Sequence, residues 1–346
     1  MRPLFLLPCV LLALAVPLGA VAAPAEPPPV PATTPAWAAA EIKVLVARGG
    51  LAASVETFRP DDPLTRTELF QALSALGLPA VVPRDPEHLV SLTELDATVV
   101  RALGATQAAN AIRLVLRDAG LQPRTYAGTE TVARVLGLRT NHPQGEEHLE
   151  LGPAEPATRA EVAYSLVRAL GVTTEQKAEL VRLARGFALP RLDTVQTAVL
   201  RRALRFIGYP YVWAGTSESP QALATGIAPG GFDCSGLVWR VYKTQPFPEL
   251  PLLGGTLKGR TTFSLAAERP RSERLPLATA QPGDLLFFGT RGPASTPQDI
   301  GHMGIALAPG WFLHSSGNGV TLQPLRGWYV NRFAWARSPI REAGLA

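Results

Sequence analysis

The sequence predicts an α+β chain, in which an all-α repeat region precedes a domain that combines helices with an antiparallel sheet. Two observations lead to this fold class. Apolar residues at helical spacing recur between residues 37 and 172, in segments that begin with helix-capping patterns. The C-terminal part instead contains an apolar strand at 281–289 and a predicted β-hairpin at 302–315.

Composition excludes several classes of protein. The chain has 346 residues, of which 47% are hydrophobic and 18% charged, so it is globular and long enough for two domains. The net charge of +5 is spread over the chain as arginine, and no basic block indicates a nucleic-acid partner. A mildly basic surface is compatible with an acidic cell-wall polymer or an anionic lipid.

The N-terminus predicts a secretory signal peptide at residues 1–22. Arg2 supplies a positive start, an apolar core follows, and Ala20-Val21-Ala22 is a small-residue cleavage site. The alternative is a retained membrane anchor, although no later stretch has the roughly 18–20 unbroken apolar residues that a spanning helix needs. Residues 23–36 are a proline-rich linker.

Cleavage would leave one cysteine in the exported chain. Cys9 lies inside the predicted signal peptide, so Cys234 remains without a partner for an internal disulfide. A lone cysteine in an exported protein is either a buried small hydrophobe or a reactive thiol.

Three segments of the repeat region share one pattern, at 64–77, 91–104 and 157–171. Each has Ser or Thr, then Glu three residues later, then apolar residues at helical spacing and a terminal glycine. Helical repeats of this kind bury their apolar faces only by stacking on one another.

The first repeat, from Trp37 to Glu68, resembles an S-layer homology (SLH) domain. The family's motif falls on Phe58, Pro60 and the Thr-Arg-Thr-Glu at 65–68. The third copy matches at 158–161, whereas the middle copy has Leu92 in place of the arginine. The resemblance spans residues 37–172 and implies non-covalent anchoring to a secondary cell-wall polymer.

Two arginines follow from the SLH resemblance as candidates for polymer binding. Arg66 and Arg159 occupy the arginine position of the first and third copies, where they would face acidic groups of the polymer. The alternative is that both lie on solvated helix ends.

A new domain is predicted at residues 193–346, after a short helix and connector at 173–192. Its first helix is amphipathic, is capped by Asp193 or Thr194 and stops at Gly208.

The predicted hairpin carries two of the five histidines, His302 and His314. A three-residue loop, Ala308-Pro309-Gly310, pairs Leu307 with Trp311 and places both histidines on one face as diagonal neighbours. A two-residue loop shifts the register and sends His314 to the opposite face. A catalytic role for the histidines therefore predicts the odd-length loop or an equivalent bulge.

A cysteine with two histidines has the layout of a thiol nucleophile. Cys234 stands where a helix begins, and a nearby histidine and a helix N-terminus both favour the thiolate. His302 would be the base, and His314 would hold its tautomer. The alternative is a core cysteine with two hairpin histidines. No metal is implied, because the set lacks a fourth ligand.

The order of five segments resembles the NlpC-type cysteine peptidases, papain-like endopeptidases of bacterial peptidoglycan. They are "IGYPYVWAG" (207–215), "FDCSGLVWRVY" (232–242), "QPGDLLFFG" (281–289), "HMGIAL" (302–307) and "FLHSSG" (312–317). The resemblance spans about residues 194–340. It implies helices packed on a central antiparallel sheet, with Cys234, His302 and His314 as catalytic residues and no cofactor.

The same resemblance implies residues that bind substrate or the oxyanion. Tyr211 would stabilise the oxyanion together with the backbone N–H of Cys234, and Asp233 and Ser235 would bind the substrate peptide. Arg260 lies where relatives carry an Arg-Ser/Thr motif. Ala214 departs from the family by replacing a glycine, and the longer segment 217–231 predicts a rim loop over the site.

The sequence therefore predicts an exported peptidoglycan hydrolase of the cell envelope. The resemblance implies cleavage of the stem peptide, at the bond between D-γ-glutamate and the diamino acid. An N-acetylmuramoyl-L-alanine amidase or an acyltransferase would use the same core and triad. A non-catalytic wall-binding protein is the remaining alternative.

Overall fold

The computed structural model describes residues 34–346, apart from 140, 144, 225, 245–246 and 248–249. These residues belong to one compact unit, Ala32–Ala346. The predicted signal peptide with Cys9, and most of the proline-rich linker, lie outside the described residues. Within the described part of the chain, no helix is long and apolar enough to cross a membrane.

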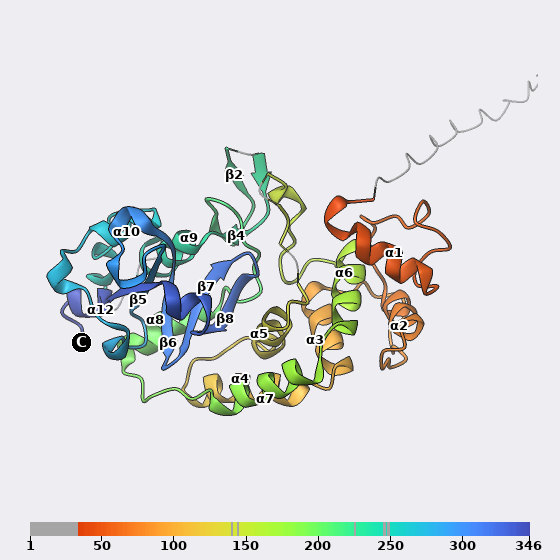
Figure 1. The fold of residues 1–346 in the computed structure, drawn as a ribbon, viewed down its shortest axis with the longest axis horizontal. Helices are drawn as coiled ribbons and strands as arrows, with labels where there is room; N and C mark the ends of the chain where they lie inside the picture. Colours follow the sequence, from red (N-terminus) through yellow and green to blue (C-terminus); the bar gives the residue numbers. More distant parts are fainter. Residues whose placement is uncertain (1–33, 140, 144, 225, 245–246, 248–249) are drawn as a thin grey trace, which may run out of the picture. The chain divides into compact units, whose positions relative to one another are not determined.

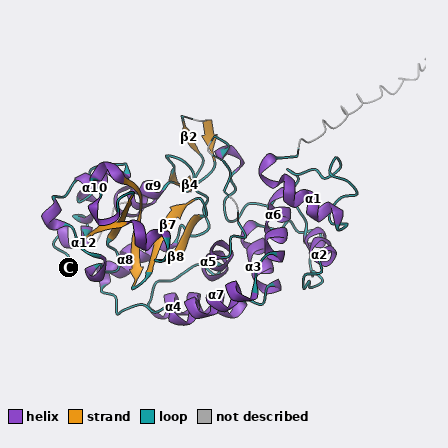
Figure 2. Cartoon of the chain, viewed as in Figure 1, coloured by secondary structure: helices purple, strands orange, loops and turns teal. Residues whose placement is uncertain are grey.

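Helices dominate the chain up to residue 186 (Figures 1 and 2). Short isolated β-bridges, such as Pro63 with Thr158, connect the segments between them. The helices are α1 (Ala39–Ala47), α2 (Arg66–Ala75), α3 (Leu92–Ala102), α4 (Thr106–Asp118), α5 (Ala127–Val135), α6 (Arg159–Leu170) and α7 (Thr174–Gly186).

Helices α2, α3 and α6 start as the three repeated patterns predict. The side chains of Thr65, Ser91 and Thr158 each accept a hydrogen bond from the backbone N–H of the glutamate three residues later. This contact satisfies one of the free amides at each helix start. Of the three, only α2 has the reciprocal bond from glutamate to the cap residue that completes a capping box.

The segments before these three helices form a closed ring of backbone hydrogen bonds. The N–H of Leu64 donates to the carbonyl of Ala157 (3.1 Å), that of Ala157 to Val90 (2.7 Å), and that of Val90 to Leu64 (2.9 Å). Each repeat therefore supplies one donor and one acceptor to its neighbours, so the ring closes only when all three are present.

Arginines form ion pairs across two of the three boundaries between repeats. Arg66 Nε lies 2.5 Å from Glu94 of the second repeat, and Arg159 Nη1 lies 2.6 Å from Glu68 of the first repeat. Both pairs connect the motif arginine of one repeat to the capping glutamate of another.

Leu92 breaks this pattern at the third boundary, so Glu161 has no equivalent arginine. His142 takes that place, with Nε2 3.4 Å from Glu161 and Nδ1 3.3 Å from Glu150. Burial lowers the pKa of His142, but the hydrogen bond and charge of Glu150 and the charge of Glu161 outweigh it, so the pKa is raised. His142 therefore stands beside Glu161 where the other two boundaries have an arginine, and its raised pKa favours the charged imidazolium.

The predicted connector contains a longer helix than expected. Helix α7 spans Thr174–Gly186, begins with a capping box at Thr173 and Gln176, and packs against α4. Helix α8 (Thr194–Leu204) then starts with Asp193, one of the two predicted caps.

The C-terminal region is built on a five-stranded antiparallel sheet with the order β8-β7-β6-β5-β9. Its strands are β5 (Leu285–Gly289), β6 (Ile300–Ala308), β7 (Trp311–Ser316), β8 (Gly319–Pro324) and β9 (Phe333–Arg337). Two small sheets pair β1 (Thr216–Ser217) with β4 (Gly231–Phe232) and β2 (Gln221–Leu223) with β3 (Gly226–Ala228). The further helices are α9 (Cys234–Trp239), α10 (Thr262–Ala267), α11 (Trp328–Arg332) and α12 (Pro339–Glu342).

The β6–β7 hairpin differs from the predicted loop but keeps the predicted register. Ala306 pairs with Phe312, whereas Ala308 pairs with Trp311, so Leu307 is the extra residue of a β-bulge. The turn itself holds only two residues, so the predicted three-residue loop is wrong. The bulge restores the register that such a loop would have given.

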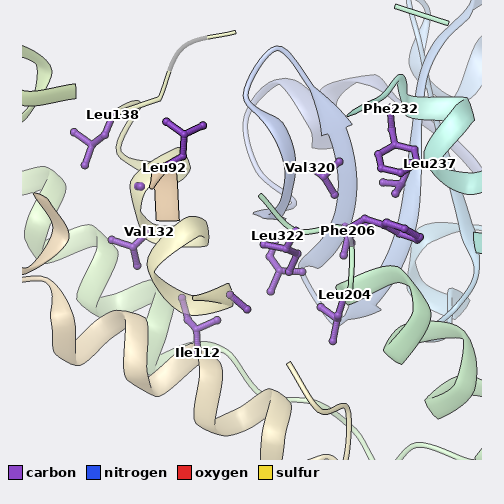
Figure 3. Close-up of a cluster of buried hydrophobic side chains, with 14 of the residues drawn as sticks. Leu92, Ile112, Val132, Leu138, Leu204, Phe206, Phe232, Leu237, Val320 and Leu322 are labelled. Atoms are coloured by element: carbon purple, nitrogen blue, oxygen red, sulfur yellow. The ribbon is translucent and has the colours of Figure 1, made fainter. Parts of the chain in front are cut away.

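One apolar cluster runs through the helical repeats and into the C-terminal region. Val132 of α5, Leu204 of α8 and Leu322 of β8 all belong to it (Figure 3). Helix α5 packs against β8, so the repeat region and the sheet share part of their core.

Candidate active site

Cys234 is the first residue of α9, and its neighbours fix the start of that helix. Asp233 caps the helix: its Oδ1 accepts hydrogen bonds from the Gly236 N–H (2.5 Å) and from the Ser235 hydroxyl (2.9 Å). A Cβ at Gly236 would lie 1.9 Å from the carbonyl oxygen of Gly215, so only glycine lets this turn approach that segment.

The sheet holds Cys234 in place from the other side. Helix α9 packs against β6 and β7, and the hydroxyl of Ser315 on β7 donates to the carbonyl of Phe232 (2.6 Å). The backbone N–H of Met303 on β6 lies near enough to the sulfur of Cys234 to lower the pKa of the thiol. The thiol therefore lies against the residue that follows His302.

The two histidines meet across the bulged hairpin. Nε2 of His302 on β6 lies 2.8 Å from Nδ1 of His314 on β7. His314 is fully buried, and its Nε2 has no hydrogen-bond partner among the described residues. Its ring packs against those of Phe312 and Tyr329. The geometry fixes the orientation of both imidazoles.

Burial sets the protonation of this site. It raises the pKa of Cys234 to about 12, with a further contribution from the charge of Asp233, and the N–H donors of Met303, Ser235 and Cys234 only partly oppose the increase. Burial also lowers the pKa of His302 to about 4 and that of His314 well below its usual value.

The resting site thus holds a neutral thiol beside neutral imidazoles. The sequence predicts a thiolate from the helix start and the neighbouring histidine, but loss of solvation outweighs both effects here. In such a neutral pair, proton transfer from the thiol to an imidazole would have to accompany any attack by the sulfur.

Cys234 opens onto a cavity of 490 Å³. Four predicted binding residues share its wall with the cysteine, and so do the exposed aromatic rings of Trp213 and Phe263. The lining residues are Tyr211, Trp213, Ala214, Asp233, Cys234, Ser235, Arg260, Thr261, Thr262, Phe263 and Gly301. The structure therefore brings together Tyr211, Asp233, Ser235 and Arg260 around the thiol.

Arg260 braces the start of the cysteine helix. Its Nη1 donates to the Ser235 hydroxyl (2.8 Å), and its Nη2 donates to Asp233 Oδ2 and to the carbonyl of Ala214, both at 3.1 Å. Ala214 has a φ of +60°, a left-handed conformation that costs an L-residue about 1–2 kcal/mol. A glycine at this position would carry no such cost.

Tyr211 presents a protonated hydroxyl. Burial is the main cause that raises its pKa above the usual value, and the neighbouring acidic groups of Cys234 and Asp233 add to the increase. A protonated phenol donates a hydrogen bond, which is the property that an oxyanion-stabilising group requires.

The two arginines of the SLH motif have different environments. Arg66 has a 27% exposed side chain and lines a groove of 260 Å³ with Arg84 and Arg101. The side chain of Arg159 is only 4% exposed, and it donates to the backbone carbonyls of Phe58 and Leu51 as well as to Glu68. This geometry favours a packing role for Arg159 over direct contact with a polymer.

Several groups at the site were not predicted from the sequence. The backbone N–H of Met303 and the ring of Phe263 carry no distinguishing sequence signal, and Trp213 lies inside a recognised motif without an assigned role. Asn141, which contacts the backbone of Tyr211, belongs to the repeat region. Among the described residues, no group of three or more His, Cys, Asp or Glu side chains could hold a metal ion.

Comparison with known families confirms both resemblances. Residues 208–338 match the model of the NlpC/P60 family, and residues 30–70 match that of the S-layer homology domain. The SLH match covers the first of the three repeats predicted within residues 37–172.

Relatives with curated names match somewhat more than a third of the chain. A probable endopeptidase of Mycobacterium tuberculosis (strain H37Rv) is 34% identical over 128 residues, which are 37% of this chain and 25% of that protein. The probable peptidoglycan endopeptidase LytE of Bacillus subtilis is 31% identical over 37% of this chain and 29% of its own. The chain thus matches between a quarter and a third of the length of these two relatives.

Solved structures match about two fifths of the chain. The NlpC/p60 domain of the peptidoglycan hydrolase SagA is 26% identical, and the match covers 41% of this chain and 97% of that domain with a TM-score of 0.30. RipD of Mycobacterium tuberculosis, described as a non-catalytic NlpC/p60 domain protein, is 27% identical over 42% of this chain and 98% of its own, with a TM-score of 0.31.

Proposed function

From the NlpC/P60 domain at residues 208–338 and the SLH domain at 30–70, which this chain carries, we propose an exported, wall-anchored cysteine endopeptidase of peptidoglycan. One observation supports catalysis above all others. The His302–His314 hydrogen bond of 2.8 Å lies on the two strands against which the Cys234 helix packs. A nucleophile, a base and an orienting group are the parts that acyl transfer requires.

The proposed reaction begins from the neutral resting pair. The sulfur of Cys234 attacks an amide carbonyl of the stem peptide while its proton moves to His302. The negative charge that develops on the carbonyl oxygen is met by the Tyr211 hydroxyl and the backbone N–H of Cys234.

His302, now an imidazolium, returns its proton to the leaving amine, and the C–N bond breaks to give a thioester on Cys234. Water then attacks the thioester, restores the thiol and releases the acid. His314 stabilises the imidazolium by accepting a hydrogen bond from His302 Nε2 at Nδ1, so His314 carries its own proton on Nε2.

We assign the scissile bond to D-γ-glutamate and the diamino acid, because the domain resembles enzymes of that class. Mass analysis of fragments released from purified sacculi tests this assignment. We expect products with L-alanyl-D-glutamate termini. Free stem peptides that begin at L-alanine would instead identify an amidase, and acyl exchange with an added amine would identify an acyltransferase.

Cys234→Ala is the control variant. It should fold normally and release no fragments from sacculi. A parent protein that binds sacculi but releases no fragment would leave only the non-catalytic alternative.

The anchoring half of the proposal rests on the groove around Arg66. Three arginines (Arg66, Arg84 and Arg101) line it beside exposed Val81 and Val82, and the one carboxylate among the described residues of its wall is that of Glu94, which pairs with Arg66. A groove with this charge suits an acidic wall polymer. The inactive Cys234→Ala protein should co-sediment with cell walls, and replacing Arg66 and Arg101 by Gln should release it.

The matched control for this experiment is Arg117→Gln, because Arg117 is an exposed arginine of α4 that lies outside the groove. If Arg117→Gln also released the protein from cell walls, binding would depend on the overall positive charge of the protein and not on the groove. Retention of the double variant would exclude the groove as the binding site.

A further inference from the structure

The loop between α5 and α6 belongs to the repeat region but contacts the backbone of Tyr211. The Oδ1 of Asn141 accepts a hydrogen bond from the Tyr211 N–H (2.8 Å), and its Nδ2 donates to the Tyr211 carbonyl (3.2 Å). One carboxamide thus satisfies both backbone polar groups of a single residue, in the manner of a neighbouring strand.

The opposite edge of the same segment is paired with β4. The N–H of Phe232 donates to the carbonyl of Pro210 (3.1 Å), and the N–H of Val212 donates to the carbonyl of Phe232 (3.2 Å). In this arrangement β4 uses the groups of Pro210 and Val212, and those of Tyr211 point away from it, towards Asn141. The backbone at Tyr211 is therefore held from both sides.

A second contact from the repeat region fixes the start of this segment. The guanidinium of Arg134 on α5, 3% exposed, donates to the carbonyl of Gly208 (2.9 Å) and to that of Asn318, while its Nε pairs with Glu130 (3.2 Å). Arg134 therefore binds the segment three residues before Tyr211 without touching Tyr211 itself.

Glu147 adds a third feature of the same loop. It lies in the 3₁₀ turn Glu147–Leu149, which packs against β3, and it is 5% exposed. Its Oε2 accepts from the Gly145 N–H (3.0 Å), whereas Oε1 has no partner among the described residues. The loop thus reaches the cavity-lining Tyr211 through the backbone clamp, and the carboxylate of Glu147 adds slightly to the raised pKa of Tyr211.

We propose that Asn141 is a positioning residue of the peptidase site, through which the repeat region fixes the Tyr211 hydroxyl where the oxyanion forms. This inference rests on the proposed endopeptidase function. It makes the repeat region part of the active site as well as an anchor. A domain cut at residue 193 would lack this support.

A double-mutant cycle between Asn141 and Tyr211 tests the inference in the full-length protein. The substrates are soluble stem tripeptides that carry either lysine or diaminopimelate after D-γ-glutamate. We expect Tyr211→Phe to lower kcat by about 100-fold, as loss of an oxyanion donor does. Asn141→Ala should lower kcat by about tenfold with little change in KM, because the donor is displaced rather than removed.

The Tyr211→Phe background separates positioning from docking. If Asn141 acts through the hydroxyl, Asn141→Ala should change the rate of Tyr211→Phe by less than about threefold. A full tenfold loss in that background would show that the contact only docks the two regions, and a parent rate in Asn141→Ala would overturn the inference outright.

Arg134→Met is the matched control, because it removes a buried contact between the same two regions while leaving the carboxamide clamp in place. It should lower the unfolding midpoint and leave kcat within about threefold of the parent. Asn141→Asp keeps the acceptor for the Tyr211 N–H and should fall between the parent and Asn141→Ala.

Amide hydrogen exchange gives a readout that does not need activity. The Tyr211 N–H should exchange faster in Asn141→Ala and remain slow in Arg134→Met. Unchanged exchange at Tyr211 in Asn141→Ala would overturn the clamp. The parent protein could fail to cleave either tripeptide while Asn141→Ala still speeds exchange at Tyr211. That result would overturn the proposed function and the catalytic role of the clamp, but not the clamp itself.

Discussion

The His302–His314 pair gives a sharp test, because only one atom of His314 is used. In the proposed mechanism His302 keeps its Nδ1 free for the thiol proton, so its Nε2 carries a hydrogen and donates to Nδ1 of His314 across 2.8 Å. Asn places its Oδ1 near the position of Nδ1, whereas Gln places its oxygen one bond further out. We therefore expect His314→Asn to keep the contact and His314→Gln to lose it.

The size of the effect follows from the charge on His302 during attack. When the thiol proton arrives, the bond to His314 becomes a hydrogen bond from a cation, which is worth about 1.5–3 kcal/mol. At about 1.36 kcal/mol per factor of ten, losing it lowers kcat/KM by roughly 10- to 150-fold. His314→Asn should stay within about fivefold of the parent, because a neutral acceptor remains.

The assay is kcat/KM on the soluble stem tripeptides, with unfolding midpoints measured in parallel. His314→Leu serves as the control that removes every acceptor, and it should match His314→Gln. Equal activity of the Asn and Gln variants would refute the assigned geometry. Full activity of the Leu variant would remove His314 from the mechanism altogether.

Three further predictions concern the resting charge state, the repeat boundaries and backbone strain. Burial lowers the pKa of His302 to about 4, so the acidic limb of the kcat/KM profile should lie near pH 4, and a limb near the ordinary histidine value of about 6.5 would contradict this. Burial also raises the pKa of Cys234 to about 12, so the rate of Cys234 alkylation should keep rising above pH 9. Arg159→Leu should lower the free energy of unfolding by about 3–5 kcal/mol, since a buried carbonyl and a carboxylate lose their hydrogen-bond donor. Arg66→Leu should lower it clearly less. Denaturant titration compares the two variants, and equal losses would show that the two arginines do not differ in their structural role. Ala214→Gly should raise the free energy of unfolding by about 0.5–1 kcal/mol, the left-handed cost of Ala minus the extra chain entropy of Gly, with a loss in denaturant titrations as the contrary result.

The sequence predicted the parts of the fold and of the site that depend on local rules. The cap at Asp193, the start of a helix at Cys234 and the register that joins His302 to His314 all follow from patterns within a few residues. This register was predicted from a three-residue loop, whereas the structure reaches it with a two-residue turn, Pro309-Gly310, and a β-bulge at Leu307. Loop length in sequence does not reveal a bulge that packing stabilises.

The parts that were not predicted depend on burial or on distant contacts. Arg66 and Arg159 share one motif, yet their side chains are 27% and 4% exposed, because only Arg159 lies beneath the chain at Leu51 and Phe58. The neutral resting state of Cys234 likewise follows from loss of solvation, which composition does not show.

The contact from Asn141 to Tyr211 joins residues 70 positions apart, in two regions that the sequence presents as separate modules. Neither residue carries a signal that points to the other, and "Asn-His-Pro" in the sequence indicates only a turn.

The covalent intermediate tests the central claim most directly. The parent protein is mixed with a stem tripeptide, quenched in acid within one turnover, and weighed intact by mass spectrometry before peptide mapping. We predict an added L-alanyl-γ-D-glutamyl group in thioester linkage on Cys234, absent from Cys234→Ala and reduced in its rate of formation in His302→Ala. Cleavage of the tripeptide at the parent rate by Cys234→Ala, with no adduct on any cysteine of the parent, would contradict it.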